Sequence, residues 1–180
     1  MNPAWFIPAV GNILVPVAGV NHLSSEISWF FFSIGLIFWI ILLVIFFNRV
    51  IFHDPIPEKL LPTMFILIAP PAVGFISSVK LLGEVSDFGR VLYYFALFMA
   101  ILLFSQVNAL KRSRFYLSWW AYSFPIAALT IASMLFYQET NYPFLKILSY
   151  SFFALLSYVI FLLLAKTIGA IANKEICVEE

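Results

Sequence analysis

Charged residues are scarce in this chain of 180 residues: they make up 11% of it, whereas 63% is hydrophobic and 19% is aromatic. In a soluble domain about a quarter of the residues are charged. The apolar residues come in successive runs of about twenty, the length that crosses a bilayer as a helix. The composition therefore indicates an all-α polytopic membrane protein. The net charge of +1 gives no indication of a nucleic-acid partner.

Ionisable residues are missing from the middle of every apolar run. Proton relays, voltage sensors and ion-coupled carriers place such residues inside the membrane, so the sequence argues against them. It also argues against an enzyme, because no base or ligand set is available there. The single cysteine, Cys177, cannot form an internal disulfide. His22 and His53 fall in connections without metal-ligand spacing. We expect no cofactor and no metal.

Six spans are predicted, at about residues 5–20, 27–47, 60–79, 91–110, 115–137 and 144–168. Interior prolines occur in the first, third and fifth spans and in none of the others, and the expected kinks are at Pro8, Pro16, Pro70, Pro71 and Pro125. The separations from Pro16 to Pro70 and from Pro71 to Pro125 are both 54 residues. Transmembrane helices are rich in proline in any case. Equal spacing nevertheless favours three tandem hairpins, each with a broken inner helix and a smooth outer helix.

The lysines and arginines predict the orientation. Seven of the ten lie on the side that carries the cluster Lys111-Arg112-Ser113-Arg114, and three lie on the other side. Both termini are therefore expected in the cytoplasm, with the protein in the plasma or inner membrane. The cluster itself is expected to anchor this topology rather than to recruit lipid or anions.

A bulky aromatic residue precedes the helix breaker at the centre of the fifth span. Pro125 removes a backbone hydrogen bond, and lipid tolerates this only beside protein or a water-filled cavity. Phe124 is therefore predicted to gate a pore by steric block or dewetting. The alternative is packing or lipid contact, the usual role of one phenylalanine among 21. Ala121 and Ala128 share its helical face and would leave room for the ring, or would allow close helix packing.

Asn12 and Gly74 complete the candidate pore lining. Asn12 either faces the pore or satisfies backbone groups freed by Pro8 and Pro16. A path lined by aromatic and small residues suits passive conduction and would discriminate among ions weakly, mainly by dehydration cost. Amides at helix interruptions would favour anions without a formal cation.

Three motifs resemble the slow anion channel and tellurite-resistance/dicarboxylate transporter family. Residues 119–125 (WWAYSFP) are similar to the family's ninth-helix motif. Residues 52–63 and 69–74 (APPAVG) resemble its sixth-to-seventh connection and seventh helix, and residues 2–16 resemble its fifth helix. The resemblance implies ten helices in five hairpins around a pseudo-five-fold pore, with odd-numbered helices inside. It also implies a trimer, with Phe124 as the gating phenylalanine.

The chain is expected to be one transmembrane domain, residues 1–180, that resembles helices five to ten only. Three inner helices cannot close a five-helix pore, so a split or truncated gene or a partner chain that supplies the missing helices is expected. The leading hypothesis is an anion channel or transporter subunit that passes small anions. The alternatives are an exporter of an organic acid or oxyanion, such as malate, sulfite or tellurite, and a non-conducting remnant.

Overall fold

The computed structural model describes residues 3–22, 24–106 and 115–174, and every regular element in these ranges is a helix. The α-helices are α1 (Phe6–Gly19), α2 (Ser25–Phe52), α3 (Ala69–Leu82), α4 (Asp87–Ser105), α6 (Ser123–Thr140) and α7 (Pro143–Ala172). Three 3-10 helices, η1 (Pro3–Trp5), η2 (Glu58–Ile68) and η3 (Leu117–Tyr122), lead directly into α1, α3 and α6. Among the residues that the structure describes, five helical spans are long and apolar enough to cross a membrane, and the first of the six predicted spans is a shorter apolar helix, Pro3–Gly19. The prediction of an all-α polytopic membrane protein is confirmed.

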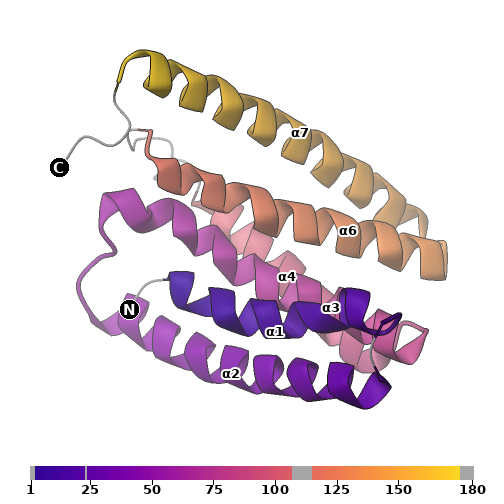
Figure 1. Cartoon of the computed structure of the whole chain (residues 1–180). Coiled ribbons are helices and arrows are strands. Elements are labelled where there is room, and N and C mark those ends of the chain that lie inside the picture. Colours follow the sequence, from indigo (N-terminus) through magenta and orange to yellow (C-terminus); the bar gives the residue numbers. More distant parts are fainter. Residues whose placement is uncertain (1–2, 23, 107–114, 175–180) are drawn as a thin grey trace.

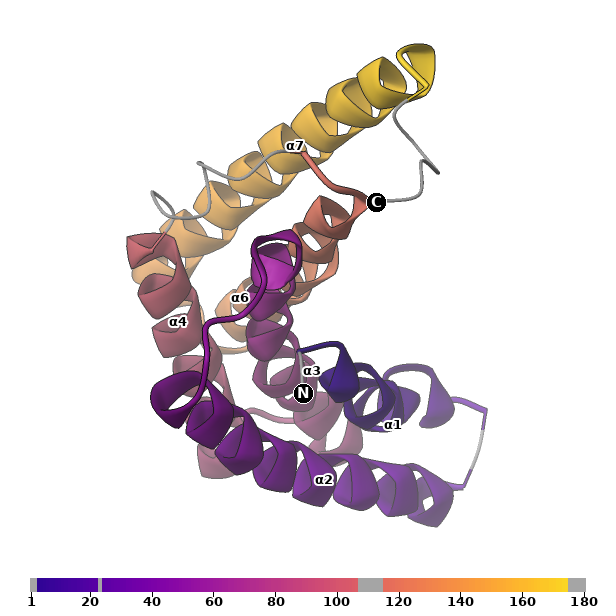
Figure 2. The same cartoon turned by 90° about the vertical axis from the view of Figure 1, so that its left-hand side faces the viewer.

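The helices pair as successive hairpins, α1 with α2, α3 with α4 and α6 with α7 (Figure 1). The helix α3 lies between α1 and α6 and contacts both. Figure 2 shows α2, α4 and α7 as an outer arc that follows the inner helices α1, α3 and α6. Burial follows this order. In the most apolar 18-residue window of each span, the buried share is 78% in η2–α3 and 44% in η3–α6, against 39% in α4, 22% in α2 and 17% in α7. The inner helices thus supply the core, and the outer helices present their apolar surface to lipid.

Prolines mark the point at which each inner span changes helix type. Pro8, Pro71 and Pro125 are each the third residue of an α-helix that follows a 3-10 helix. The first turn accepts proline because its missing N–H would have no partner inside the helix. Pro16 lies farther along, inside α1. Pro16 and Pro70, which are 54 residues apart, are therefore not equivalent positions of the repeat. The equivalent prolines of the three hairpins are Pro8, Pro71 and Pro125.

Short caps close two of the hairpins. Gly83 caps the C-terminus of α3, and its φ of 75° lies in the left-handed region that glycine adopts without strain. Ser86 caps the N-terminus of α4, and its Oγ accepts a hydrogen bond from the Gly89 N–H at 3.1 Å. Asn141, also left-handed with φ 56°, caps the C-terminus of α6 two residues before α7 begins. These turns hold α4 against α3 and α7 against α6.

Close backbone contact and buried hydrogen bonds fix how the helices pack. A Cβ atom on Gly35 of α2 would lie 2.7 Å from the Ala9 carbonyl oxygen and from the Ile13 backbone nitrogen, so α2 crosses α1 backbone to backbone. The Ser77 hydroxyl of α3 donates to the Ile13 carbonyl oxygen at 2.6 Å. These contacts hold α2 and α3 against α1 in one register.

Candidate functional site

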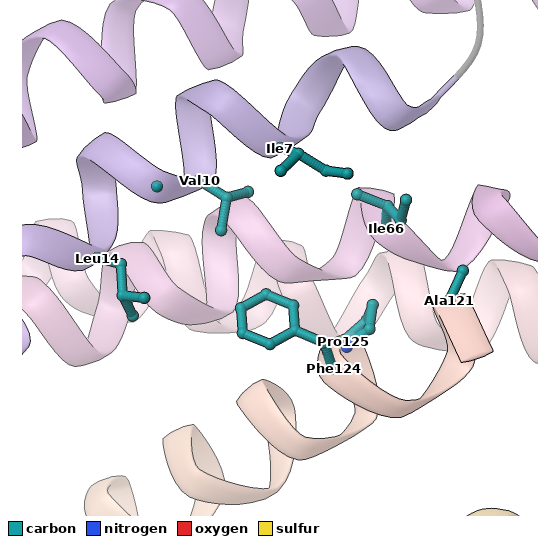
Figure 3. A pocket seen from close by; sticks show the side chains of 8 residues that line it. Ile7, Val10, Leu14, Ile66, Ala121, Phe124 and Pro125 are labelled. Atoms are coloured by element: carbon teal, nitrogen blue, oxygen red, sulfur yellow. The ribbon is translucent and has the colours of Figure 1, made fainter.

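An apolar groove lies between α1 and α6, with η2 beneath it (Figure 3). Its volume is about 410 Å³. The lining residues are all apolar: Ile7, Val10, Gly11, Leu14, Ile66, Ala121, Phe124 and Pro125. All three inner spans contribute to this lining, so the groove is the surface that the inner helices share. We call it the inner groove.

The Phe124 ring projects into the inner groove from the first turn of α6. Figure 3 shows the ring extending from α6 toward Leu14 of α1. Phe124 is 46% exposed, whereas Ile126, two residues later, is 3% exposed. The proline in the first turn of α6 is buried, whereas the ring beside it is about half exposed. This placement agrees with a residue that can block the groove, and gating remains a prediction.

The other candidate pore residues divide into two groups. Ala121 and Pro125 lie in the lining beside Phe124. Ala128 is buried at 4% exposure and is not part of the lining. A Cβ atom on Gly74 would lie 3.1 Å from Leu92 Cδ1 of α4, so Gly74 faces an outer helix.

Asn12 lies away from the inner groove. Its Nδ2 donates to the Pro8 carbonyl oxygen at 2.9 Å. Both residues border a separate cavity with Ile34 and Phe38 of α2. The Pro8 carbonyl lies four residues back in the same helix and is not one that Pro8 or Pro16 leaves without a partner, so both roles open to Asn12 stay predictions. The remaining candidate kinks, Pro16, Pro70 and Pro71, are buried in α1 and α3.

The first span supplies four lining residues that the sequence interpretation missed: Ile7, Val10, Gly11 and Leu14. Their spacing of three, four and seven residues from Ile7 places them on one helical face. A second signal was the tetrapeptide PAVG, which occurs at 8–11 and again at 71–74. Aligning these copies would have registered Pro8 with Pro71 and shown that Ile7 holds the position of Phe124.

The wall around the bend is held by hydrogen bonds from small hydroxyls. Ser123 Oγ donates to the Trp120 carbonyl oxygen at 2.7 Å, and Ser118 Oγ donates to the Lys59 carbonyl oxygen at 2.5 Å. Trp120 Nε1 donates to Thr167 Oγ1 of α7 at 3.0 Å. These bonds tie η3 to η2 and to α7, so the start of α6 has a rigid support.

Within the described ranges, no group of three His, Cys, Asp or Glu side chains is arranged to hold a metal ion. The residues that line the inner groove carry no ionisable group. What the groove offers chemically is its volume, its lack of charge and the half-exposed ring of Phe124.

Residues 1–168 match the family model described as "SLAC1: Voltage-dependent anion channel". The chain belongs to this family. The resemblance found in the motifs is thereby confirmed, and the chain is an integral membrane protein of an anion channel and transporter family.

Three relatives illustrate the range of the family. The S-type anion channel SLAH2 of Arabidopsis thaliana is 31% identical over 148 residues, which cover 82% of this chain and 28% of the relative. The uncharacterized transporter MJ0762 of Methanocaldococcus jannaschii is 26% identical over 199 residues, covering 98% and 58%. The sulfite efflux pump SSU1 of Arthroderma benhamiae is 23% identical over 181 residues, covering 82% and 48%. The chain therefore spans less than two thirds of the length of each of these relatives.

Proposed function

We propose that this chain forms part of the wall of an anion channel or transporter, in which small anions move passively along the inner groove and the Phe124 ring closes the path. The observation that carries the proposal is the uncovered ring of Phe124, which lies in a groove whose other lining residues are apolar. An apolar constriction of this kind closes by steric block or by dewetting.

The preference for anions comes from the backbone rather than from side chains. The first turns of α1 and α6 border the inner groove at Ile7 and Phe124. In both helices the positive ends of the peptide dipoles point to the N-terminal side, where η1 and η3 continue the helix, and we propose that this partial charge favours anions. Because no cation is fixed in the lining, selectivity follows the cost of dehydration, and weakly hydrated anions are favoured. The same lack of ionisable groups argues for a transport protein and against an enzyme.

The described inner helices line only part of a closed path. We propose that residues 1–180 form one transmembrane domain equivalent to helices five to ten of a ten-helix fold, and that further hairpins, in this chain or a partner, complete the wall. A trimer of such units is the proposed assembly. Seven of ten lysines and arginines on one side support cytoplasmic termini in a plasma or inner membrane.

Bilayer recordings of the assembled channel test the proposal. Phe124→Ala is expected to raise anion conductance at unchanged protein level, because it removes the ring from the groove. Phe98→Ala, at a residue of α4 that is 54% exposed but outside the groove, is the matched control and should leave conductance unchanged. Equal conductance of the Phe124→Ala channel and the unmodified channel would count against the gate.

A carrier that exports an organic acid or oxyanion is the second candidate, and the likeness to a sulfite efflux pump favours it. Its flux would saturate with substrate and show no single-channel steps. A non-conducting assembly protein is the third candidate. It would give no flux alone or together with a chain that supplies further hairpins.

A further inference from the structure

The helical faces that carry Ile7 and Phe124 continue beyond these two residues. Leu14 lies seven residues after Ile7 in α1, and Ile131 lies seven residues after Phe124 in α6. Seven residues make nearly two full turns of an α-helix and rise about 10 Å, so the two members of each pair share one helical face. Leu14 lines the inner groove together with Ile7, and Figure 3 shows it on α1, across the groove from α6. Ile131 therefore lies on the face of α6 that presents Phe124 to the groove.

Leu14 and Ile131 hold equivalent positions, because each is the ninth residue of its α-helix. Leu14 is 40% exposed and Ile131 is 54% exposed, whereas Ala132, beside Ile131, is fully buried. The ninth residue of α3 is Ser77, which is also fully buried and donates its hydroxyl hydrogen to the Ile13 carbonyl oxygen at 2.6 Å. At this level, as at the level of Phe124, large apolar side chains of α1 and α6 are uncovered on either side of a closed α3.

Small residues separate the two levels. Gly11 of α1 is exposed, and no atom lies within 4 Å of the position that its Cβ would take. Ala127 of α6, three residues after Phe124, is half-buried. The two helices thus present large apolar side chains at both levels and a glycine and an alanine between them. A path along these faces would be narrow, then wider, then narrow again.

We propose that Leu14 and Ile131 form a second apolar constriction, which determines specificity among anions when Phe124 does not block the path. This inference rests on the proposed function, in which anions move along the inner groove. Aliphatic side chains offer no hydrogen bond to an anion or to its water, so passage between them costs dehydration. The second constriction therefore favours weakly hydrated anions. The space at Gly11 holds the anion between the two constrictions.

Two constrictions in series predict a specific dependence on Phe124. The higher barrier limits the current, so a change at Ile131 should leave conductance unchanged while the Phe124 ring is present. In the Phe124→Ala channel the second constriction limits the current instead. Its contribution is therefore measured in that background.

Bilayer recordings of the assembled Phe124→Ala channel test the proposal. Adding Ile131→Thr should raise chloride conductance about fivefold, the effect of one neutral hydrogen bond on the barrier. It should also lower the preference for iodide over chloride, because chloride holds its water more strongly. Adding Ile131→Val, which has the shape of threonine without the hydroxyl, should change neither quantity. Ile37→Thr of α2, at a residue that is 58% exposed but outside the groove, is the control and should also change neither.

The outcomes separate this proposal from the proposed gate. Equal chloride conductance of the Ile131→Thr and Ile131→Val channels overturns the second constriction, whereas a rise with Phe124→Ala alone still supports the gate. Equal conductance of the Phe124→Ala channel and the unmodified channel overturns the gate. The comparison of Ile131→Thr with Ile131→Val in the unmodified channel then decides on the constriction.

The accessibility of position 131 to water gives a readout that needs no current. In a chain that carries Cys177→Ser, a thiol introduced by Ile131→Cys should react with water-soluble sulfonatoethyl methanethiosulfonate. A thiol introduced by Ile37→Cys should not react, because α2 presents its apolar surface to lipid. Protection of the Ile131→Cys thiol would mean that lipid or another helix covers this face of α6, and it would overturn the proposal.

Discussion

Ile7 and Phe124 hold the same position in two different helices. Each is the second residue of an α-helix that follows a 3-10 helix, each directly precedes a proline, and both line the inner groove. The corresponding residue of the middle span is Pro70, which is buried. The two uncovered side chains therefore come from the inner helices on either side of α3, and both narrow the same groove.

Ile7→Ala is expected to raise anion conductance, though by less than Phe124→Ala, because the side chain removed from the proposed path is smaller. Conductance recordings of Ile7→Ala, Phe124→Ala and the double variant show whether the two effects add. We expect them not to add, because both side chains border the same groove. Ile37→Ala of α2 is the matched control, since Ile37 and Ile7 are both 58% exposed. A similar rise with Ile37→Ala would contradict a specific role for Ile7.

Gly11→Leu is expected to have the opposite effect. No atom lies within 4 Å of the position that a Cβ of Gly11 would take, so a new side chain would enter the groove without displacing a neighbour. We expect conductance to fall about tenfold, which corresponds to about 1.4 kcal/mol on the barrier. Gly169→Leu on α7 is the control, because its Cβ position is equally open and the same helix propensity changes there. Unchanged conductance with Gly11→Leu would show that the path does not pass Gly11.

The helices and the family were predictable from the sequence because the signals are local. Apolar runs mark the spans, and the motif that ends at Phe124 and Pro125 marks both the bend and the resemblance. The predicted ends of α2 were short by several residues, because the helix continues past the apolar run into polar residues such as Asn48 and Arg49. The predicted end of the fourth span, at residues 107–110, lies outside the described residues.

The lining of the groove was only partly predictable, because it depends on how separate helices face one another. Gly74 and Asn12 lie in inner spans as expected, but the packing of α4 on α3 turns Gly74 outward, and Asn12 borders a cavity with α2. The separation of Pro16 and Pro70 equals that of Pro71 and Pro125, which suggested that Pro16 and Pro70 are equivalent. In the structure Pro16 lies inside α1, whereas Pro70 lies in the first turn of α3. Which face of a helix lines the groove depends on contacts between residues far apart in the sequence, and local sequence patterns do not predict these contacts.

Gly35→Ala should destabilise the hairpin of α1 and α2. The added Cβ would lie 2.7 Å from two backbone atoms of α1, which cannot move aside as a side-chain end can. Overpacking of this kind costs about 1–3 kcal/mol, so the midpoint of thermal unfolding in detergent should fall. Gly169→Ala, where nothing lies within 4 Å, should leave the midpoint unchanged or raise it slightly. Equal midpoints for the two variants would mean that α2 does not cross α1 at Gly35.

Ser133→Ala should cost more stability than Tyr93→Phe, although both remove the same hydrogen bond between α4 and α6. The Tyr93 hydroxyl and Ser133 Oγ are 2.9 Å apart, and Ser133 Oγ also donates to the Leu129 carbonyl oxygen at 2.8 Å. Tyr93 is therefore the donor of the shared bond.

In Tyr93→Phe the serine keeps its bond to Leu129, so we expect a loss of about 0.6 kcal/mol, the average for such bonds in membranes. In Ser133→Ala the hydroxyl of the fully buried Tyr93 is left without a partner, which costs about 1–3 kcal/mol. Unfolding in detergent measures both variants, with Tyr94→Phe, at a residue that is 51% exposed, as the control. A larger loss for Tyr93→Phe than for Ser133→Ala would reverse the donor assignment.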